Sequence, residues 1–324
     1  MTSTSTTPTR PYTWTPHPTK SSKRKVSVPK GTLTFREPHT PILLLCYDLE
    51  TTGRSPWYND MTQLCVQFVG YRPWVHDETR FTVHHTYTTF VHTNQHLPRD
   101  VSELTGIHSS DLVHAPRFDA VYRDLQAQVD HWSTILHTMH NVWVAHNGFQ
   151  FDGLILARYL ARTHDGGQGL TTRENTEDPS AEGQRLFWCA DTVVMARTQF
   201  KAKALKGSKS NPPSTLIQAP DNFKLQTLYT YFRNRASEGD SSASENGLTF
   251  HRADDDVTAM VVVLRGLDVL WPGVVLEMVC RDGVFMDRVR GDSRNTSTPL
   301  QTSLQTSLQT SLQTSLQTSL QAPL

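Results

Sequence analysis

Apolar and polar positions predict a set of consecutive strands at the start of the folded part of the chain. Residues 42–47 form an uninterrupted apolar run, whereas residues 63–71 alternate between apolar and polar side chains. A continuous run is typical of a buried strand, and alternation indicates a strand that is partly exposed. A third strand is expected over residues 80–91, so that the three strands form a meander.

Helices and strands alternate in the rest of the folded part. The last helix has a clear pattern, because Val257, Val261 and Leu264 share one face. Pro272 marks its end. Strands that alternate with helices indicate an α/β domain. The elements expected after the meander are a helix from Pro98, a helix over 118–140, a strand over 142–145, a helix over 151–161, a strand over 186–190 and the last helix over about 253–270.

Polar tails are expected at both ends of the chain. Residues 1–38 are rich in Thr, Pro, Ser and basic side chains, a composition that buries too little apolar surface to fold. Residues 291–324 contain a tandem Gln-Thr-Ser-Leu repeat. Because leucines at a period of four drift around a helix, we expect a disordered tail, with a weak partner-binding helix as the alternative.

One folded domain over residues 39–290 is the simplest division of the chain. A polar, Gly-rich stretch at 163–185 interrupts it and predicts an inserted surface loop. Two similar interruptions are expected at about 204–221 and 236–247.

Composition excludes some classes of protein but does not identify a binding partner. Lys and Arg together number 31, as do Asp and Glu, so the chain has no overall positive charge that would indicate binding to nucleic acid. The four cysteines are far apart, which argues against a CxxC zinc site and against a disulfide framework. The sequence shows no signal-type apolar segment and no apolar run long enough to span a membrane. We expect an intracellular protein, cytoplasmic or nuclear, without membrane contact.

Two carboxylates end the first expected strand. Asp48 and Glu50 stand two apart, and side chains two apart in a strand point to the same side. Two anions pressed together at the edge of a core repel each other, which favours a cation between them. Oxygen ligands of this kind suit Mg²⁺ or Mn²⁺ better than zinc. The alternative, that this Asp-x-Glu segment only caps a strand, stays open from these residues alone.

Two further acidic segments each open an expected helix. A His-Asn-Gly segment, residues 146–148, is followed by Asp152 in a first helical turn, where the helix dipole favours a carboxylate without any catalytic role. His251 precedes Asp256 by five residues at the start of the last helix, close enough for both to reach one site. The three successive aspartates there, residues 254–256, are also typical of a helix N-terminal charge cluster.

In this order the three segments resemble the exonuclease motifs of the DEDDh family, the RNase T and DNA polymerase III epsilon-type 3′–5′ exonucleases. The first motif corresponds to residues 48–53, the second to residues 146–148 with residues 151–152, and the third to the H-x-A-x-x-D arrangement of residues 251–256. The His-Asn-Gly form is similar to the TREX and RNase T branches. The resemblance spans about residues 40–270 and implies an RNase H-like fold, with a mixed central β-sheet flanked by α-helices.

The resemblance implies a metal-dependent enzyme that hydrolyses terminal phosphodiester bonds at the 3′ end of DNA or RNA with two Mg²⁺ or Mn²⁺ ions. It assigns the role of general base to His251 and makes Asp48 the ligand that bridges both ions. The residues implied in catalysis are Asp48, Glu50, Asp152, His251 and Asp256, and the four carboxylates among them are the implied metal ligands. The residues implied in substrate binding are Leu49, Thr51, Thr52, His146 and Asn147.

Several features leave function and partners open. A non-catalytic module of the same fold that binds nucleic-acid ends is the alternative, although it predicts the loss of a ligand or of the base. Two basic stretches are either nucleic-acid contacts or ordinary solvated segments, and the first is also compatible with a nuclear-import signal. The resemblance allows a homodimer formed through a sheet edge, which no residue of the sequence demands. The cations of the two stretches are Lys20, Lys23, Arg24 and Lys25, and then Arg197, Lys201, Lys203, Lys206 and Lys209.

Overall fold

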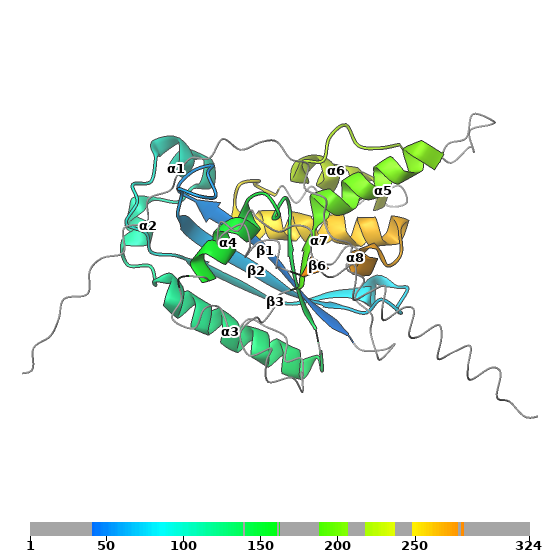
Figure 1. Cartoon of the computed structure of the whole chain (residues 1–324), viewed down its shortest axis with the longest axis horizontal. Coiled ribbons are helices and arrows are strands. Elements are labelled where there is room, and N and C mark those ends of the chain that lie inside the picture. Colours follow the sequence, from blue (N-terminus) through cyan, green and yellow to red (C-terminus); the bar gives the residue numbers. More distant parts are fainter. Residues whose placement is uncertain are drawn as a thin grey trace, which may run out of the picture.

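The structure is a computed structural model that describes residues 41–138, 140–160, 162, 188–206, 218–236, 248–277 and 280–281 (Figure 1). The two expected tails and the inserted loop over residues 163–185 lie outside the described residues. Most of the two interruptions expected at about 204–221 and 236–247 lies outside them as well.

The described strands form one mixed sheet in the order β3-β2-β1-β4-β5-β6. The central strand, β1, is antiparallel to β2 and parallel to β4; β3 pairs with β2, β5 runs parallel to β4, and β6 pairs antiparallel with β5. The mixed sheet and flanking helices expected of an RNase H-like fold are therefore confirmed. The strands are β1 (Ile42–Thr51), β2 (Met61–Tyr71), β3 (Phe81–Phe90), β4 (Asn141–Ala145), β5 (Trp188–Asp191) and β6 (Cys280–Arg281).

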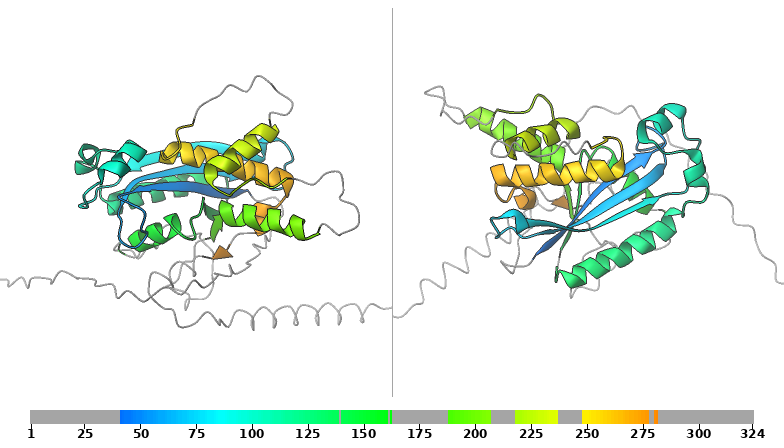
Figure 2. Two further views of the ribbon diagram at one scale, coloured as in Figure 1. Left: turned by 90° about the horizontal axis from the view of Figure 1, so that it is seen from above. Right: turned by 180° about the vertical axis from the view of Figure 1, so that it is seen from behind.

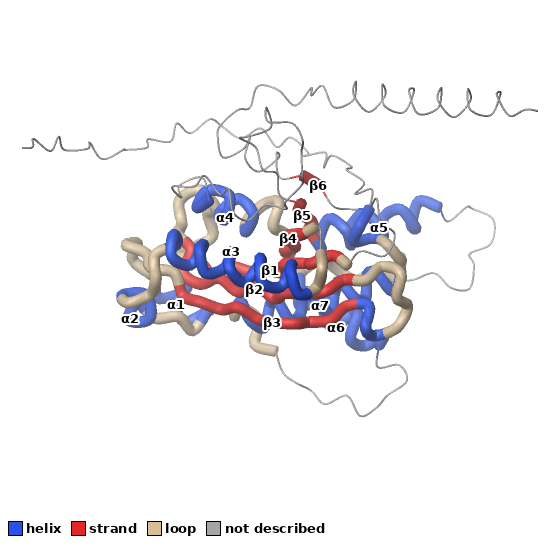
Figure 3. The backbone as a smooth tube through the Cα atoms, turned by 90° about the horizontal axis from the view of Figure 1, so that it is seen from below, coloured by secondary structure: helices blue, strands red, loops and turns tan. Residues whose placement is uncertain are grey.

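Strand β1 is covered on both faces, which explains its uninterrupted apolar run. Successive side chains of a strand point to opposite faces. Leu43 and Leu45 accordingly belong to one buried cluster, whereas Leu44 and Cys46 belong to another. Helices α3 and α4 contribute to the first cluster, and α5, α6, α7 and α8 contribute to the second. Figures 2 and 3 show the strands as a layer with helices on both sides.

The helical segments have the following bounds. Helices α1 (Arg99–Thr105) and α2 (Ser109–Val113) lie between β3 and α3 in the chain, and a short 3-10 helix, η1 (Glu78–Arg80), precedes β3. The longer helices are α3 (Phe118–Ile135), α4 (Asp152–Leu160), α5 (Thr192–Lys206), α6 (Leu225–Ala236) and α7 (Ala253–Leu270), and α8 (Val274–Glu277) follows. No helix within the described ranges is long and apolar enough to cross a bilayer.

Two differences from the expected elements have physical causes. The helix expected over 118–140 ends at Ile135, because His137 adopts a left-handed φ of 51°, which a helix does not continue through. Helices α5 and α6 were not predicted. The apolar residues of α5 do not gather on one face, and its second half carries several lysines, so its sequence resembles a solvated loop.

Candidate active site

The end of β1 places two carboxylates on the face of the sheet that α7 covers. Asp48 and Glu50 lie opposite Cys65 and Gln63 of β2, and the pairing shifts register directly after Glu50. Their two-residue spacing puts them on the same face as Leu44 and Cys46. Both side chains are partly buried at the edge of this core.

The first turn of α7 brings a third carboxylate to this pair. Side-chain oxygens of Asp48, Glu50 and Asp256 lie within 4.8 Å of one another. The backbone amide of His251 donates a hydrogen bond of 3.2 Å to Asp256 Oδ2. Asp256 Oδ1 is buried and accepts no hydrogen bond from any residue that the structure describes, so one carboxylate oxygen of this group has no partner among them. An unpartnered, buried oxygen beside two other carboxylates fits a hard divalent cation.

Asp152 reaches the same region from the other face of the sheet. It begins α4 and is only 5% exposed. Asp152 is not part of the 4.8 Å group, but among neighbouring charges its carboxylate is the largest influence on the pKa of Asp48. The backbone amide of Leu49, which lies between Asp48 and Glu50, favours the ionised form of Asp152 and so lowers its pKa.

The four carboxyl groups have raised pKa values, because burial and mutual repulsion both disfavour their charged forms. Burial raises the pKa of Asp48 well above its ordinary value, and the charges of Asp152, Glu50 and Asp256 raise it further. Burial raises the pKa of Glu50 to about 8 and that of Asp152 to about 7. The pKa of Asp256 is raised to about 6, mainly by burial. A cation bound at this site would relieve the repulsion and favour the ionised forms.

His251 occupies the turn that leads into α7. Its backbone has a left-handed φ of 72°, and its side chain is exposed. Asparagine and histidine adopt such conformations more often than most residues, but at a cost in free energy. The turn therefore presents an accessible imidazole five residues before the ligand candidate Asp256.

The connection between β4 and α4 is held by a buried carboxylate that sequence reasoning did not assign to the site. Asp191, at the end of β5, accepts hydrogen bonds from the backbone amides of Asn147 at 3.1 Å and Phe149 at 3.0 Å. Asn147 has a left-handed φ of 64°. A Cβ atom on Gly148 would lie 2.6 Å from Ala145 Cβ, so this position requires glycine. The sequence signal that could have indicated this role is an aspartate directly after the strand expected over residues 186–190.

His146 and Asn147, both implied in substrate binding, differ in exposure. The imidazole Nδ1 of His146 is 2.7 Å from Thr192 Oγ1 at the start of α5. Burial, aided by the charge of Arg197, lowers the pKa of His146 to about 4, so the ring is neutral at neutral pH. The Asn147 side chain is exposed.

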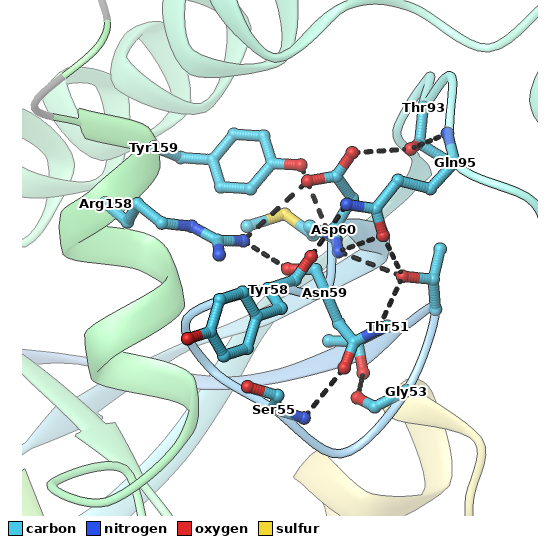
Figure 4. A network of polar contacts seen from close by, with 12 residues as sticks. Thr51, Gly53, Ser55, Tyr58, Asn59, Asp60, Thr93, Gln95, Arg158 and Tyr159 are labelled. Atoms are coloured by element: carbon cyan, nitrogen blue, oxygen red, sulfur yellow. Dashed lines mark hydrogen bonds and ion pairs between the residues drawn. The ribbon is translucent and has the colours of Figure 1, made fainter. Parts of the chain in front are cut away.

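The other implied substrate contacts lie at the end of β1 and at the first residue of the loop that follows it. Leu49 is buried. Thr51 Oγ1 donates to the Gly53 carbonyl at 2.6 Å, and Thr52 Oγ1 donates to Gln95 Oε1 at 2.7 Å. Both hydroxyls are thus engaged in internal hydrogen bonds, and Figure 4 shows the polar network around them.

The second basic stretch lies partly on α5. Arg197 and Lys201 are exposed, and the Arg197 guanidinium lies over the ring of Phe223 at 5.9 Å from its centroid. Lys209 lies outside the described residues, as does the basic cluster of the first tail.

Comparison with solved structures finds similarity to several nucleases. Cell-death related nuclease 4 shares 15% sequence identity at a TM-score of 0.41, over 72% of this chain and 65% of that one. A complex of E. coli exonuclease I with a dA16 oligonucleotide shares 16% identity at a TM-score of 0.43, over 73% of this chain and 42% of that one. A 3′-exonuclease from a structure of 3′-end specific recognition of the histone mRNA stem-loop shares 13% identity at a TM-score of 0.41. The match covers 71% of this chain and 64% of that one.

This chain spans less than two thirds of the length of those three proteins. No protein-family model matches the chain, and no curated protein sequence matches it.

Proposed function

We propose that the protein is a metal-dependent 3′–5′ exonuclease of the DEDDh type that removes terminal nucleotides from DNA or RNA. The proposal depends above all on one observation. Asp48 and Glu50 are more than 200 residues from Asp256 in the sequence, yet their carboxylates lie within 4.8 Å of it. His251 lies in the turn that precedes Asp256, so the histidine and the three acidic positions of this group occur together in the order of the family motifs.

The carboxylates are the groups that would hold two Mg²⁺ or Mn²⁺ ions. Asp48, Glu50 and Asp256 would hold one, and Asp152, whose charge acts on Asp48, would hold a second together with Asp48. Ions bound there would lower the pKa of a bound water molecule and neutralise negative charge on the scissile phosphate.

The remaining catalytic task belongs to His251. Its exposed imidazole would accept a proton from the water that attacks the terminal phosphodiester. Leu49, between Asp48 and Glu50, and the exposed Asn147 would contribute contacts to the terminal nucleotide. Thr51, Thr52 and His146, whose polar side-chain atoms are engaged internally, would shape the surrounding walls.

Release of mononucleotides from 3′-labelled single-stranded DNA and RNA tests this proposal. We expect trimming from the 3′ end with Mg²⁺ or Mn²⁺, and loss of most activity in Asp48→Ala. Asp130→Ala, which removes an exposed carboxylate from the middle of α3, is the control and should keep full activity. If the folded protein binds ends but cuts neither substrate with either ion, the proposal fails in favour of a non-catalytic end-binding module.

A further inference from the structure

The loop between β1 and β2 carries two aromatic side chains in contact with solvent. Trp57 is 36% exposed and Tyr58 is 59% exposed. Within the described residues neither ring packs against another aromatic ring or a cation. Arg54, also exposed, forms no ion pair there. A cation and two adjacent rings are thus available on one short loop.

Hydrogen bonds within the loop fix its shape. The backbone amide of Asn59 donates to the Ser55 carbonyl at 3.0 Å, and Asn59 Oδ1 accepts from the Ser55 amide at 2.8 Å. The Thr52 amide donates to the Asp60 carbonyl at 2.8 Å, which closes the base of the loop. Asn59 also packs so closely over Gly53 that a Cβ atom there would lie 2.8 Å from Asn59 Nδ2.

Contacts with neighbouring segments fasten the loop to the part of the fold that carries the carboxylates (Figure 4). Gln95 Nε2 donates to the Tyr58 carbonyl at 2.7 Å. Arg158 of α4 donates to the Asn59 carbonyl and lies 3.8 Å from Asp60. Because α4 begins at Asp152 and β1 ends beside Glu50, the backbone that carries the aromatic pair is held in a fixed position relative to the site.

We infer that Trp57 and Tyr58 form a stacking surface for unpaired nucleobases of the strand whose 3′ end occupies the carboxylate site, with Arg54 beside its phosphates. The inference rests on the proposed function. Exposed aromatic rings cost little conformational entropy when the backbone beneath them is already ordered. Aromatic rings interleaved with cations are the usual means of binding single strands without reading their sequence. The ordered loop that follows β1 carries both the aromatic rings and a cation.

Binding of single-stranded DNA tests the inference apart from catalysis. The probe is a fluorescent oligonucleotide with phosphorothioate linkages, in Ca²⁺, and a second probe lacks the bases near the 3′ end. We expect the double substitution Trp57→Ala and Tyr58→Ala to weaken binding of the first probe about 5- to 20-fold and of the abasic probe less than about 2-fold. Trp57→Phe, which keeps an aromatic ring, should stay within about 2-fold of the wild type.

The controls separate this inference from the proposed function. Ile135→Ala removes an exposed apolar side chain from the end of α3 and should leave both affinities unchanged. Equal weakening on both probes, or none on either, overturns the inference even if Asp48-dependent cleavage is present. Conversely, base-dependent weakening in a protein that never cuts supports the stacking surface and refutes only the catalytic proposal.

Discussion

The main-chain amide of His251 donates a hydrogen bond of 3.2 Å to Asp256 Oδ2, while the imidazole of the same residue is exposed. The link between the two residues is therefore made by the backbone and does not need the ring. A substitution of the His251 side chain leaves this hydrogen bond in place. Proton transfer and metal binding can thus be tested separately.

We expect His251→Asn to lower the turnover rate by about 10²- to 10⁴-fold, the usual contribution of a general base. Asparagine tolerates the left-handed φ of 72° at this position, so the turn should persist. The affinity for Mn²⁺, measured by calorimetric titration, should change little. A parallel loss of Mn²⁺ affinity and of turnover would contradict the role of base.

The raised pKa values of the carboxyl groups predict a pH-dependent stability. In the folded protein the pKa is about 8 for Glu50, about 7 for Asp152 and about 6 for Asp256, against ordinary values of 4.5 and 3.8. Between about pH 4 and pH 8 the folded state therefore holds more protons than the unfolded state. The contribution of these carboxyl groups to the free energy of unfolding must therefore decrease as pH rises from about 4 to about 8.

Urea denaturation at pH 5.5 and pH 8 checks this expectation. In EDTA, we expect Asp48→Asn to be more stable than the wild type at pH 8 by about 1–3 kcal/mol, because it removes one of the repelling charges. Mg²⁺ should stabilise the wild type more at pH 8 than at pH 5.5, since binding competes with protons. Equal Mg²⁺ stabilisation at both pH values would count against a cation among these carboxylates.

Asp191 is expected to be a stability determinant for the connection between β4 and α4. Besides the amides of Asn147 and Phe149, it accepts a hydrogen bond from the Val193 amide at 2.9 Å. Asp191→Ala removes the acceptor from several buried donors, so we expect a loss of about 2–4 kcal/mol in the free energy of unfolding. Asp191→Asn keeps one oxygen acceptor and should lose less. A loss below about 0.5 kcal/mol in Asp191→Ala would show that the connection is held by other contacts.

Arg158 is expected to control the order of the loop between β1 and β2. Arg158→Met keeps the apolar stem and removes the cation that binds the Asn59 carbonyl and Asp60. Amide hydrogen exchange should accelerate in residues 53–60 and stay unchanged in the centre of β2. Arg99→Met, which removes an exposed guanidinium paired with Glu103, is the matched control. Unchanged protection of the loop in Arg158→Met would contradict this role.

Periodicity in the sequence was sufficient to predict β1 and α7, two of the elements that carry the carboxylates. The two-residue spacing of Asp48 and Glu50 placed both on one face of β1, and the expected helix over residues 253–270 agrees with α7. The convergence of Asp256 on this pair was suggested by the resemblance of the motifs. Periodicity alone says nothing of how the first turn of a helix meets the end of a strand.

Sequence patterns could not reveal the contacts made by side chains from distant segments. The loop between β1 and β2 is fastened by Gln95 and Arg158, which come from two other parts of the chain and are not part of any motif. Asp191 likewise acts through four backbone amides whose positions depend on the completed fold. Such roles follow from three-dimensional packing, which no local spacing encodes.

The four carboxylates come from one central strand and from the first turns of α4 and α7, which pack on opposite faces of the sheet. The exposed loops that join the described strands and helices supply none of these four ligands. Changes of length confined to such loops would therefore alter the surface around the carboxylates more than the carboxylates themselves. Evolution could thus vary the choice of substrate in this architecture without rebuilding the reaction centre.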